Sequence, residues 1–169
     1  MKKKYGLSVL FVLLLVVVVG CSSDNNNVLS NTTSVTTEKL TMEVPSSFER
    51  STNGDAVVYS WDDFDGERKN SCSLRIYSSQ SYSFTNVEEK ARNNVNYMVT
   101  SPEDVNVSTT TINGNVWTVA EVSTSKSKYS SYVIVNDDIL YEVLYNDIGS
   151  GDFCGEAFNT IVNSLKFNY

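Results

Sequence analysis

Short stretches of alternating hydrophobic and polar residues predict several β-strands. Leu40, Met42 and Val44 alternate with polar neighbours up to Pro45, which predicts a half-buried strand that the proline ends. Residues 56–61 are predicted to form a second strand. A third strand follows an acidic turn and carries Cys72, Leu74 and Ile76 on one face.

Two stretches change to a helical period. Between residues 85 and 99, four apolar residues recur every three or four positions, while Thr85 and Glu88 fit a capping box and Pro102 prevents the helix from continuing. Near the C-terminus, a stronger apolar stripe predicts a second helix: Phe153, Ala157, Phe158, Ile161, Val162 and Leu165.

Two hairpins are predicted between the helices. Residues 105–122 turn at Asn113-Gly114, a favoured pair for a two-residue type I′ turn, and residues 129–145 turn at 136–138. The last strand of the second hairpin has apolar residues on both faces, which predicts a central place in the sheet. Phe167 and Tyr169 are interpreted as a short edge strand.

The order of elements predicts an α+β fold. Three strands, a helix, two hairpins and a closing helix indicate an α/β/α sandwich, with a mainly antiparallel sheet of about six to seven strands and a helix on each side. We assign the globular domain to residues 38–169. Residues 21–37 are rich in Ser, Thr and Asn, and we expect a disordered tether there.

Two local patterns resemble a known family of domains. The strand end Val44-Pro45 with Phe48, and the close Phe158-x-x-Ile161-Val162-x-Ser164-Leu165-x-Phe167, are similar to the PsbP-like, Mog-like and DcrB-like domains. The resemblance implies the same α/β/α sandwich over most of residues 38–169. It also implies a non-enzymatic role, since members of the family assist photosystem II assembly, bind a small GTPase or are bacterial lipoproteins.

The first 21 residues have the parts of an export signal. Three lysines precede an apolar run at residues 7–19, which is shorter than the ~20 residues that span a bilayer. The run ends in Val18-Val19-Gly20-Cys21, which resembles the lipobox of bacterial lipoproteins. This resemblance implies removal of residues 1–20 and a diacylglyceryl anchor on Cys21 at the outer face of the cell membrane. Ser22 leaves outer-membrane sorting open in a Gram-negative cell.

The mature chain would be strongly acidic. The chain has 13 basic and 20 acidic residues, so loss of Lys2, Lys3 and Lys4 leaves 10 basic residues and a net charge of −10 once the amine is acylated. Such a surface repels phosphate backbones, and we therefore exclude nucleic acid as a partner. The membrane contact is assigned to the lipid on Cys21.

Two cysteines remain besides Cys21. In an oxidising compartment Cys72 and Cys154 can form a disulfide, worth about 4–5 kcal/mol in the chain-entropy treatment of so long a loop. The alternative is a pair of buried thiols packed as small hydrophobic groups. The spacing of the two residues leaves both interpretations open.

Few residues point to catalysis or to a cofactor. The chain has no histidine, which excludes Ser-His-Asp and Cys-His sites, and it has no phosphate-binding glycine loop. The weak metal candidates are carboxylates in the turn before the third strand, namely Asp62, Asp63, Asp65 and Glu67. An EF-hand alignment places Trp61 and Cys72 at ligand positions, so a solvated turn is the better interpretation. Tyr129, Tyr132, Tyr141 and Tyr145 are a candidate aromatic surface, although strand propensity also accounts for them.

These observations predict a lipid-anchored, extracytoplasmic protein that is not an enzyme and has no cofactor. Its domain is interpreted as a binding or assembly module for another envelope component, with an envelope protein as the expected partner. A small-ligand or cation-binding lipoprotein is the alternative, and a carboxylate-based hydrolase ranks last.

Overall fold

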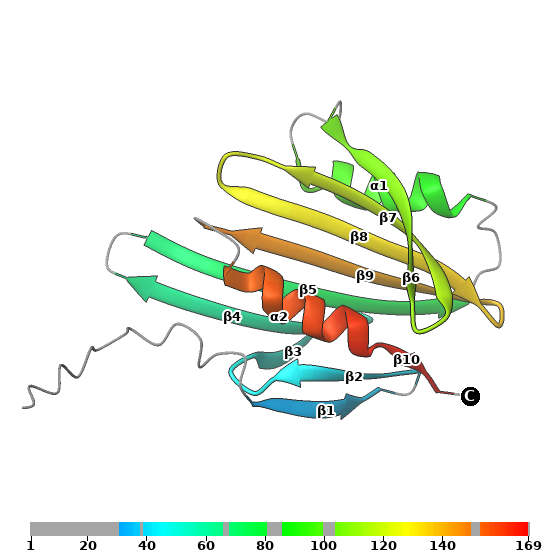
Figure 1. Ribbon diagram of the computed structural model, residues 1–169, viewed down its shortest axis with the longest axis horizontal. Coiled ribbons are helices and arrows are strands. Elements are labelled where there is room, and N and C mark those ends of the chain that lie inside the picture. The colour runs from blue at the N-terminus through cyan, green and yellow to red at the C-terminus, as the bar shows by residue number, and fades with distance from the viewer. Residues whose placement is uncertain are drawn as a thin grey trace, which may run out of the picture.

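Seven antiparallel strands form the main sheet of the protein (Figure 1). The computed structural model describes residues 31–37, 39–65, 68–80, 86–99, 104–149 and 153–168. In spatial order the strands are β3 (Glu49–Asn53), β4 (Ala56–Asp65), β5 (Arg68–Gln80), β9 (Ile139–Ile148), β8 (Ser127–Asn136), β7 (Asn115–Ser123) and β6 (Asn106–Ile112).

Strand β9 lies at the centre of this sheet, as its sequence predicted. It pairs with β5 on one side, where Leu74 is opposite Tyr145, and with β8 on the other, where Tyr132 is opposite Val143. Six of its ten residues in succession, from Leu140 to Tyr145, are buried. Because both faces are covered, the side chains of β9 contribute to both hydrophobic cores.

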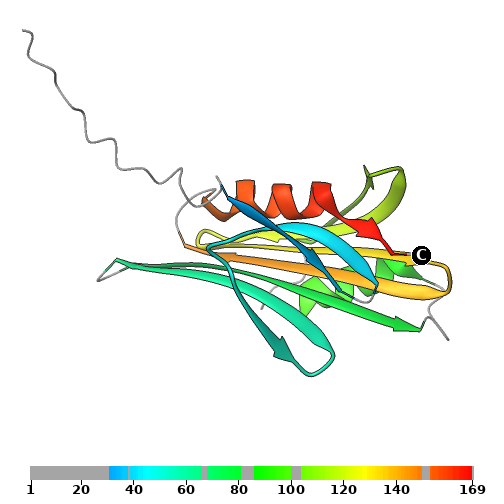
Figure 2. The same ribbon diagram turned by 90° about the horizontal axis from the view of Figure 1, so that it is seen from below.

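The two helices cover opposite faces of the sheet (Figure 2). Helix α1 (Val87–Asn96) buries Ala91 and Val95 against β7 and β8, and helix α2 (Phe153–Ser164) packs on the other face. This arrangement confirms the predicted α+β sandwich. The cap of α1 differs from the prediction, because Asn86 is the N-cap and its side chain accepts a hydrogen bond from the Glu89 amide at 3.0 Å. Thr85 lies outside the described residues.

A second, three-stranded sheet lies beside α2. It has the order β1 (Thr32–Thr36), β2 (Leu40–Pro45) and β10 (Lys166–Phe167), and β2 buries Leu40, Met42 and Val44 in the same core as α2. The Ser164 hydroxyl accepts a hydrogen bond from the Glu43 amide at 2.8 Å, which joins β2 to the end of the helix. The second sheet and α2 thus form one layer over the main sheet (Figure 1).

Three strands, two of this layer and one of the main sheet, differ from the sequence expectations. Strand β1 lies inside the stretch 21–37, where we expected a disordered tether, because its backbone pairs with β2 from Thr32 to Thr36 although most of its side chains are exposed. Strand β10 is a short edge strand, as expected, but it is at the edge of the second sheet, where it pairs with β2. Strand β3 was missed because all five of its residues are polar and exposed, so no hydrophobic alternation marks it.

Both predicted hairpin turns have the backbone of a type I′ turn. Asn113 and Gly114 have φ of 49° and 81°, and Asp137 and Asp138 have φ of 49° and 60°. The Asn113 side chain also donates hydrogen bonds to the carbonyls of Asn163 at 3.0 Å and Leu165 at 2.7 Å. The first turn therefore satisfies carbonyl groups at the C-terminal end of α2.

The larger core lies between the main sheet and the α2 layer. Phe158 stacks on Tyr145 with 4.0 Å between ring centroids, and Phe167 stacks on Trp117 at 5.9 Å. A disulfide joins Cys72 of β5 to Cys154 of α2, with 6.0 Å between the Cα atoms. Within the described ranges, no helix has the length and hydrophobicity needed to cross a bilayer.

Candidate binding groove beside helix α1

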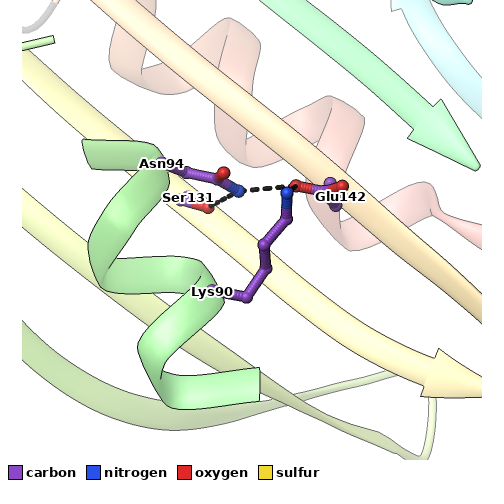
Figure 3. A network of polar contacts seen from close by, with 4 residues as sticks. All are labelled: Lys90, Asn94, Ser131 and Glu142. Atoms are coloured by element: carbon purple, nitrogen blue, oxygen red, sulfur yellow. Dashed lines mark hydrogen bonds and ion pairs between the residues drawn. The ribbon is translucent and has the colours of Figure 1, made fainter. Parts of the chain in front are cut away.

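A buried polar network joins α1 to the centre of the sheet (Figure 3). Glu142 points from β9 toward the helix and is only 7% exposed. Its Oε2 accepts a hydrogen bond from Asn94 Nδ2 at 2.7 Å and lies 3.2 Å from Lys90 Nζ. The same amide group donates to Ser131 Oγ on β8 at 3.1 Å. The carboxylate thus has both a counter-ion and a hydrogen-bond donor, as a buried charge requires.

Helix α1 covers only part of its face of the sheet. It packs over β6, β7 and β8, and it leaves the same face of β5 uncovered. The helix is only ten residues long and buries just two small apolar side chains, so it covers a narrow strip of the sheet. An open groove therefore runs between α1 and β5, with β9 as its floor.

Two adjoining hollows make up this groove, which we call the α1 groove. The first has a volume of about 420 Å³ and the second about 250 Å³. Together these volumes are in the range of clefts that bind small molecules, roughly 300–1,000 Å³. The first hollow is lined by Arg75, Tyr77, Lys90, Asn94, Tyr97, Met98, Glu142 and Leu144. The second shares Arg75, Met98 and Leu144 and adds Ser73, Tyr129, Tyr145 and Asn146.

Three groups in the α1 groove are suited to contact a ligand. Tyr97, at the C-cap of α1, is 91% exposed although it is a large aromatic residue. Arg75 is exposed and forms no ion pair with a carboxylate of the described residues. The Oδ1 atom of Asn146 is buried and has no hydrogen-bond partner in the described part of the chain. Native structures leave few buried polar atoms unpaired, so Asn146 marks a place where a donor is missing.

Of the four acidic candidates, only Asp62 has a described side chain, so a common site among them stays a prediction. Asp62 is an exposed residue of β4, opposite Ser71 of β5. Asp63 and Asp65 continue the same strand, but their side chains and the whole of Glu67 lie outside the described part of the structure. Among the residues whose side chains are described, no group of three or more carboxylates or cysteines is placed to bind a metal ion.

The four tyrosines of the second hairpin do not form one surface. Tyr141 and Tyr145 are buried in the core beneath α2, and Tyr132 packs edge-on against Phe158 with 5.3 Å between the rings. Tyr129 faces the α1 side and lines the groove, and Tyr145, although part of the core beneath α2, also borders the second hollow. The interpretation of these residues as a single aromatic surface is therefore wrong, because successive strand positions alternate between the two faces of the sheet.

The α1 groove has no continuous signature in the sequence. Its walls come from β5, α1 and β9, which are distant in the sequence and meet only through strand pairing. One signal was present in the sequence, since Glu142 occupies the face of β9 that also carries Leu140 and Leu144. A carboxylate between two buried leucines indicates a specific partner on the element that covers them.

Comparisons with known proteins add information about the fold. No protein-family model matches the chain, and no curated protein sequence matches it. Among solved structures, the Ran-binding protein Mog1p of Saccharomyces cerevisiae aligns with 80% of this chain and 95% of its own, at 11% identity and a TM-score of 0.52. The chain shares its fold.

Further structures align over a similar range. LpqN of Mycobacterium tuberculosis, described as involved in cell envelope biogenesis, aligns over 82% of this chain and 91% of its own, with 12% identity and a TM-score of 0.50. Cyanobacterial PsbP from Synechocystis aligns over 82% of this chain and 92% of its own, with 16% identity and a TM-score of 0.48. In a longer Bacteroides thetaiotaomicron protein the chain spans 45% of the length, with a TM-score of 0.43. The alignments with Mog1p and LpqN confirm the resemblance to Mog-like domains for the fold.

Proposed function

We propose that this chain is a lipoprotein, anchored through Cys21 outside the cell membrane, whose domain binds another envelope component without catalysis. The α1 groove is the binding surface in this proposal. The observation that carries it is the combination, along one open groove, of an exposed Tyr97, an exposed Arg75 and Asn146, whose buried Oδ1 has no hydrogen-bond partner in the described residues. Side chains of this kind contact ligands, because they combine a flat apolar surface with directional hydrogen bonding.

The chemistry of the groove favours binding over catalysis. Its one carboxylate, Glu142, is engaged by Lys90 and Asn94, and among the residues lining the groove there is no second carboxylate to act with it as an acid–base pair. The proteins that share the fold support the same proposal. Mog1p is described as Ran-binding and LpqN as involved in cell envelope biogenesis, and neither description names a reaction.

The anchor is proposed from the N-terminal sequence. The lipobox Val18-Val19-Gly20-Cys21 and the basic, apolar stretch before it support cleavage and acylation at Cys21. We expect the natural protein to partition with membranes and a Cys21→Ser variant to be released into the soluble fraction. A variant that stays with the membranes would contradict the proposed anchor.

Binding through the groove can be tested in intact cells. A photo-reactive amino acid placed at Tyr97 should crosslink to a specific envelope component, identified by mass spectrometry. The matched control is the same amino acid at Asn163, an exposed residue of α2 in the layer that covers the opposite face of the sheet. Equal crosslinking from both positions, or none from Tyr97, would argue against the groove as the binding surface.

A further inference from the structure

We infer that the α1 groove binds a saccharide that carries a carboxylate, as some amino sugars of cell-wall glycans do. The inference rests on the proposed function in one respect, which is that an extracytoplasmic domain is exposed to such glycans. The groove provides three kinds of contact that this class of ligand needs: an aromatic surface, a hydrogen-bond acceptor and a cation.

Tyr97 provides the aromatic surface. Its side chain is 91% exposed, and Met98 and the half-buried Tyr77 lie along the same hollow. The C–H face of a sugar ring packs well on the face of an aromatic ring. Tyrosine does this with little loss of conformational entropy, because its side chain has only two rotatable angles.

Asn146 provides a hydrogen-bond acceptor. Asn146 lines the second hollow, and its Oδ1 is buried and has no hydrogen-bond partner in the described residues. A carbonyl oxygen of this kind needs an N–H or O–H donor, and hydroxyl and amide groups on a sugar are such donors. Arg75 and Ser73 line the same hollow and are further polar groups beside it.

Arg75 provides the cation. The charge of Lys90 is balanced by Glu142 at 3.2 Å, whereas Arg75 is exposed and has no carboxylate partner in the described part of the chain. The groove therefore has one unbalanced positive charge on a protein that is acidic overall. A guanidinium group can form two parallel hydrogen bonds with a carboxylate, so it favours one acidic substituent on the ligand.

The position of the groove argues against an extended peptide as the ligand. Its sheet surface is formed by β5 and β9, and each of these strands is paired on both sides, β5 with β4 and β9, and β9 with β5 and β8. A peptide adds to a sheet only at an edge strand, where backbone groups are unpaired. Recognition in this groove must therefore use side chains, which suits a sugar.

The test compares two sugars that differ by one substituent. The mature full-length protein, from Cys21 onward and in detergent, is titrated by calorimetry with N-acetylglucosaminyl-N-acetylmuramic acid and with N,N′-diacetylchitobiose, which has no carboxylate. We expect the acidic disaccharide to bind with a Kd about tenfold lower than that of chitobiose. Arg75→Gln should remove this preference but keep the binding of chitobiose.

Further variants separate the contacts. Tyr97→Ala should weaken the binding of both sugars about equally, and Asn163→Ala, on the opposite layer, should change neither. Chemical-shift changes in the unmodified protein should map to Arg75, Tyr97 and Asn146, and this readout does not depend on a variant that folds. No binding of either sugar at about 10 mM, or a preference that survives Arg75→Gln, would overturn the inference.

The outcomes distinguish this inference from the proposed function. If neither sugar binds but the probe at Tyr97 captures an envelope protein in cells, the groove is a protein-binding surface and the saccharide inference is wrong. If the acidic sugar binds but Cys21→Ser leaves the protein on membranes, the sugar site stands and the proposed anchor is wrong.

Discussion

Asn94 of α1 donates a hydrogen bond of 2.7 Å to the buried carboxylate of Glu142 on β9 (Figure 3). This bond, together with Lys90, satisfies a charge that the sheet would otherwise bury beneath a helix. Because Ala91 and Val95 are the fully buried residues of α1, this polar contact adds to a small apolar interface between the helix and the sheet.

Replacing Asn94 with Ala should destabilise the protein by about 1–3 kcal/mol, because the buried carboxylate of Glu142 loses a donor and Ser131 loses a partner. Urea unfolding at neutral pH measures the change. The matched control is Asn93→Ala on the exposed side of the same helix, which makes the same gain in helix propensity. Equal effects of the two substitutions would contradict a stabilising role for the network.

Removing the disulfide should lower stability strongly. Cys72 and Cys154 are separated by 82 residues, and a loop of that length corresponds to about 4–5 kcal/mol in the chain-entropy treatment. Unfolding of the Cys72→Ser/Cys154→Ser double variant measures this loss. Alkylation of the unfolded, unreduced protein is the check on the bond itself, and modification of both cysteines would show that they are free thiols.

Alkaline pH should destabilise the protein through Tyr132. The pKa of Tyr132 is raised to about 12, mainly because the side chain is buried beneath α2. The negative charge of Glu121 makes a smaller contribution to this rise. The unfolded chain ionises near the ordinary value of about 10 and binds fewer protons than the folded one between pH 10 and 12. The contribution of Tyr132 to the free energy of unfolding is thus fully present below pH 10 and is lost as the pH rises toward 12.

We expect this loss to be about 1–2 kcal/mol after allowance for the partial exposure of the side chain. Tyr132→Phe cannot ionise and should show a correspondingly smaller decline over the same range. Denaturant unfolding of both proteins at pH 7 and at several values above pH 10 tests this. The difference in free energy of unfolding between the two proteins at pH 7 measures the effect of the substitution without ionisation. If the stability of both proteins then declines equally with rising pH, ionisation of the Tyr132 phenol has no role.

Asn113 should stabilise the protein in two separable ways. It has a φ of 49° in the turn, and its side chain bonds to the carbonyls of Asn163 and Leu165. Asn113→Gly preserves the backbone preference and removes only the side-chain bonds, so we expect a loss of about 1 kcal/mol. Asp137→Gly, at a second turn residue with φ of 49°, is the control and should cost little. If Asn113→Gly left the free energy of unfolding in urea unchanged, the side-chain bonds to the end of α2 would contribute nothing to stability.

The fold was predictable where hydrophobic period and turn chemistry agree. The pair Asn113-Gly114 placed one hairpin correctly, and the apolar residues on both faces of β9 placed that strand at the centre of the sheet. Strands β1 and β3 were not predicted, because their residues are almost all exposed and only backbone pairing holds them in the sheets. The formation of such strands depends on pairing with a neighbouring strand, and their own sequences show no alternation of hydrophobic and polar residues.

The candidate site was far less predictable than the fold. The acidic residues attracted attention because they are adjacent in the sequence, whereas Arg75, Tyr97 and Asn146 become neighbours only after β5, α1 and β9 assemble. The cysteines illustrate the same limit, since their spacing was compatible with either a bond or two thiols, and the pairing of β5 beneath α2 decides between them.

Strand β1 also limits how far the domain can reach. The Asn31 carbonyl accepts a hydrogen bond from the amide of Ser46, the residue after β2. With Cys21 in the bilayer, as proposed, ten residue steps would separate it from Asn31, a contour length of at most about 35 Å. If the chain were unpaired as far as residue 37, the contour length from Cys21 would be about 56 Å. With the shorter linker, the effective concentration of a membrane-proximal target would be about twofold higher, because it varies with roughly the −3/2 power of linker length. In the proposed anchored form of the protein, the first strand would set the distance over which the domain can reach a target.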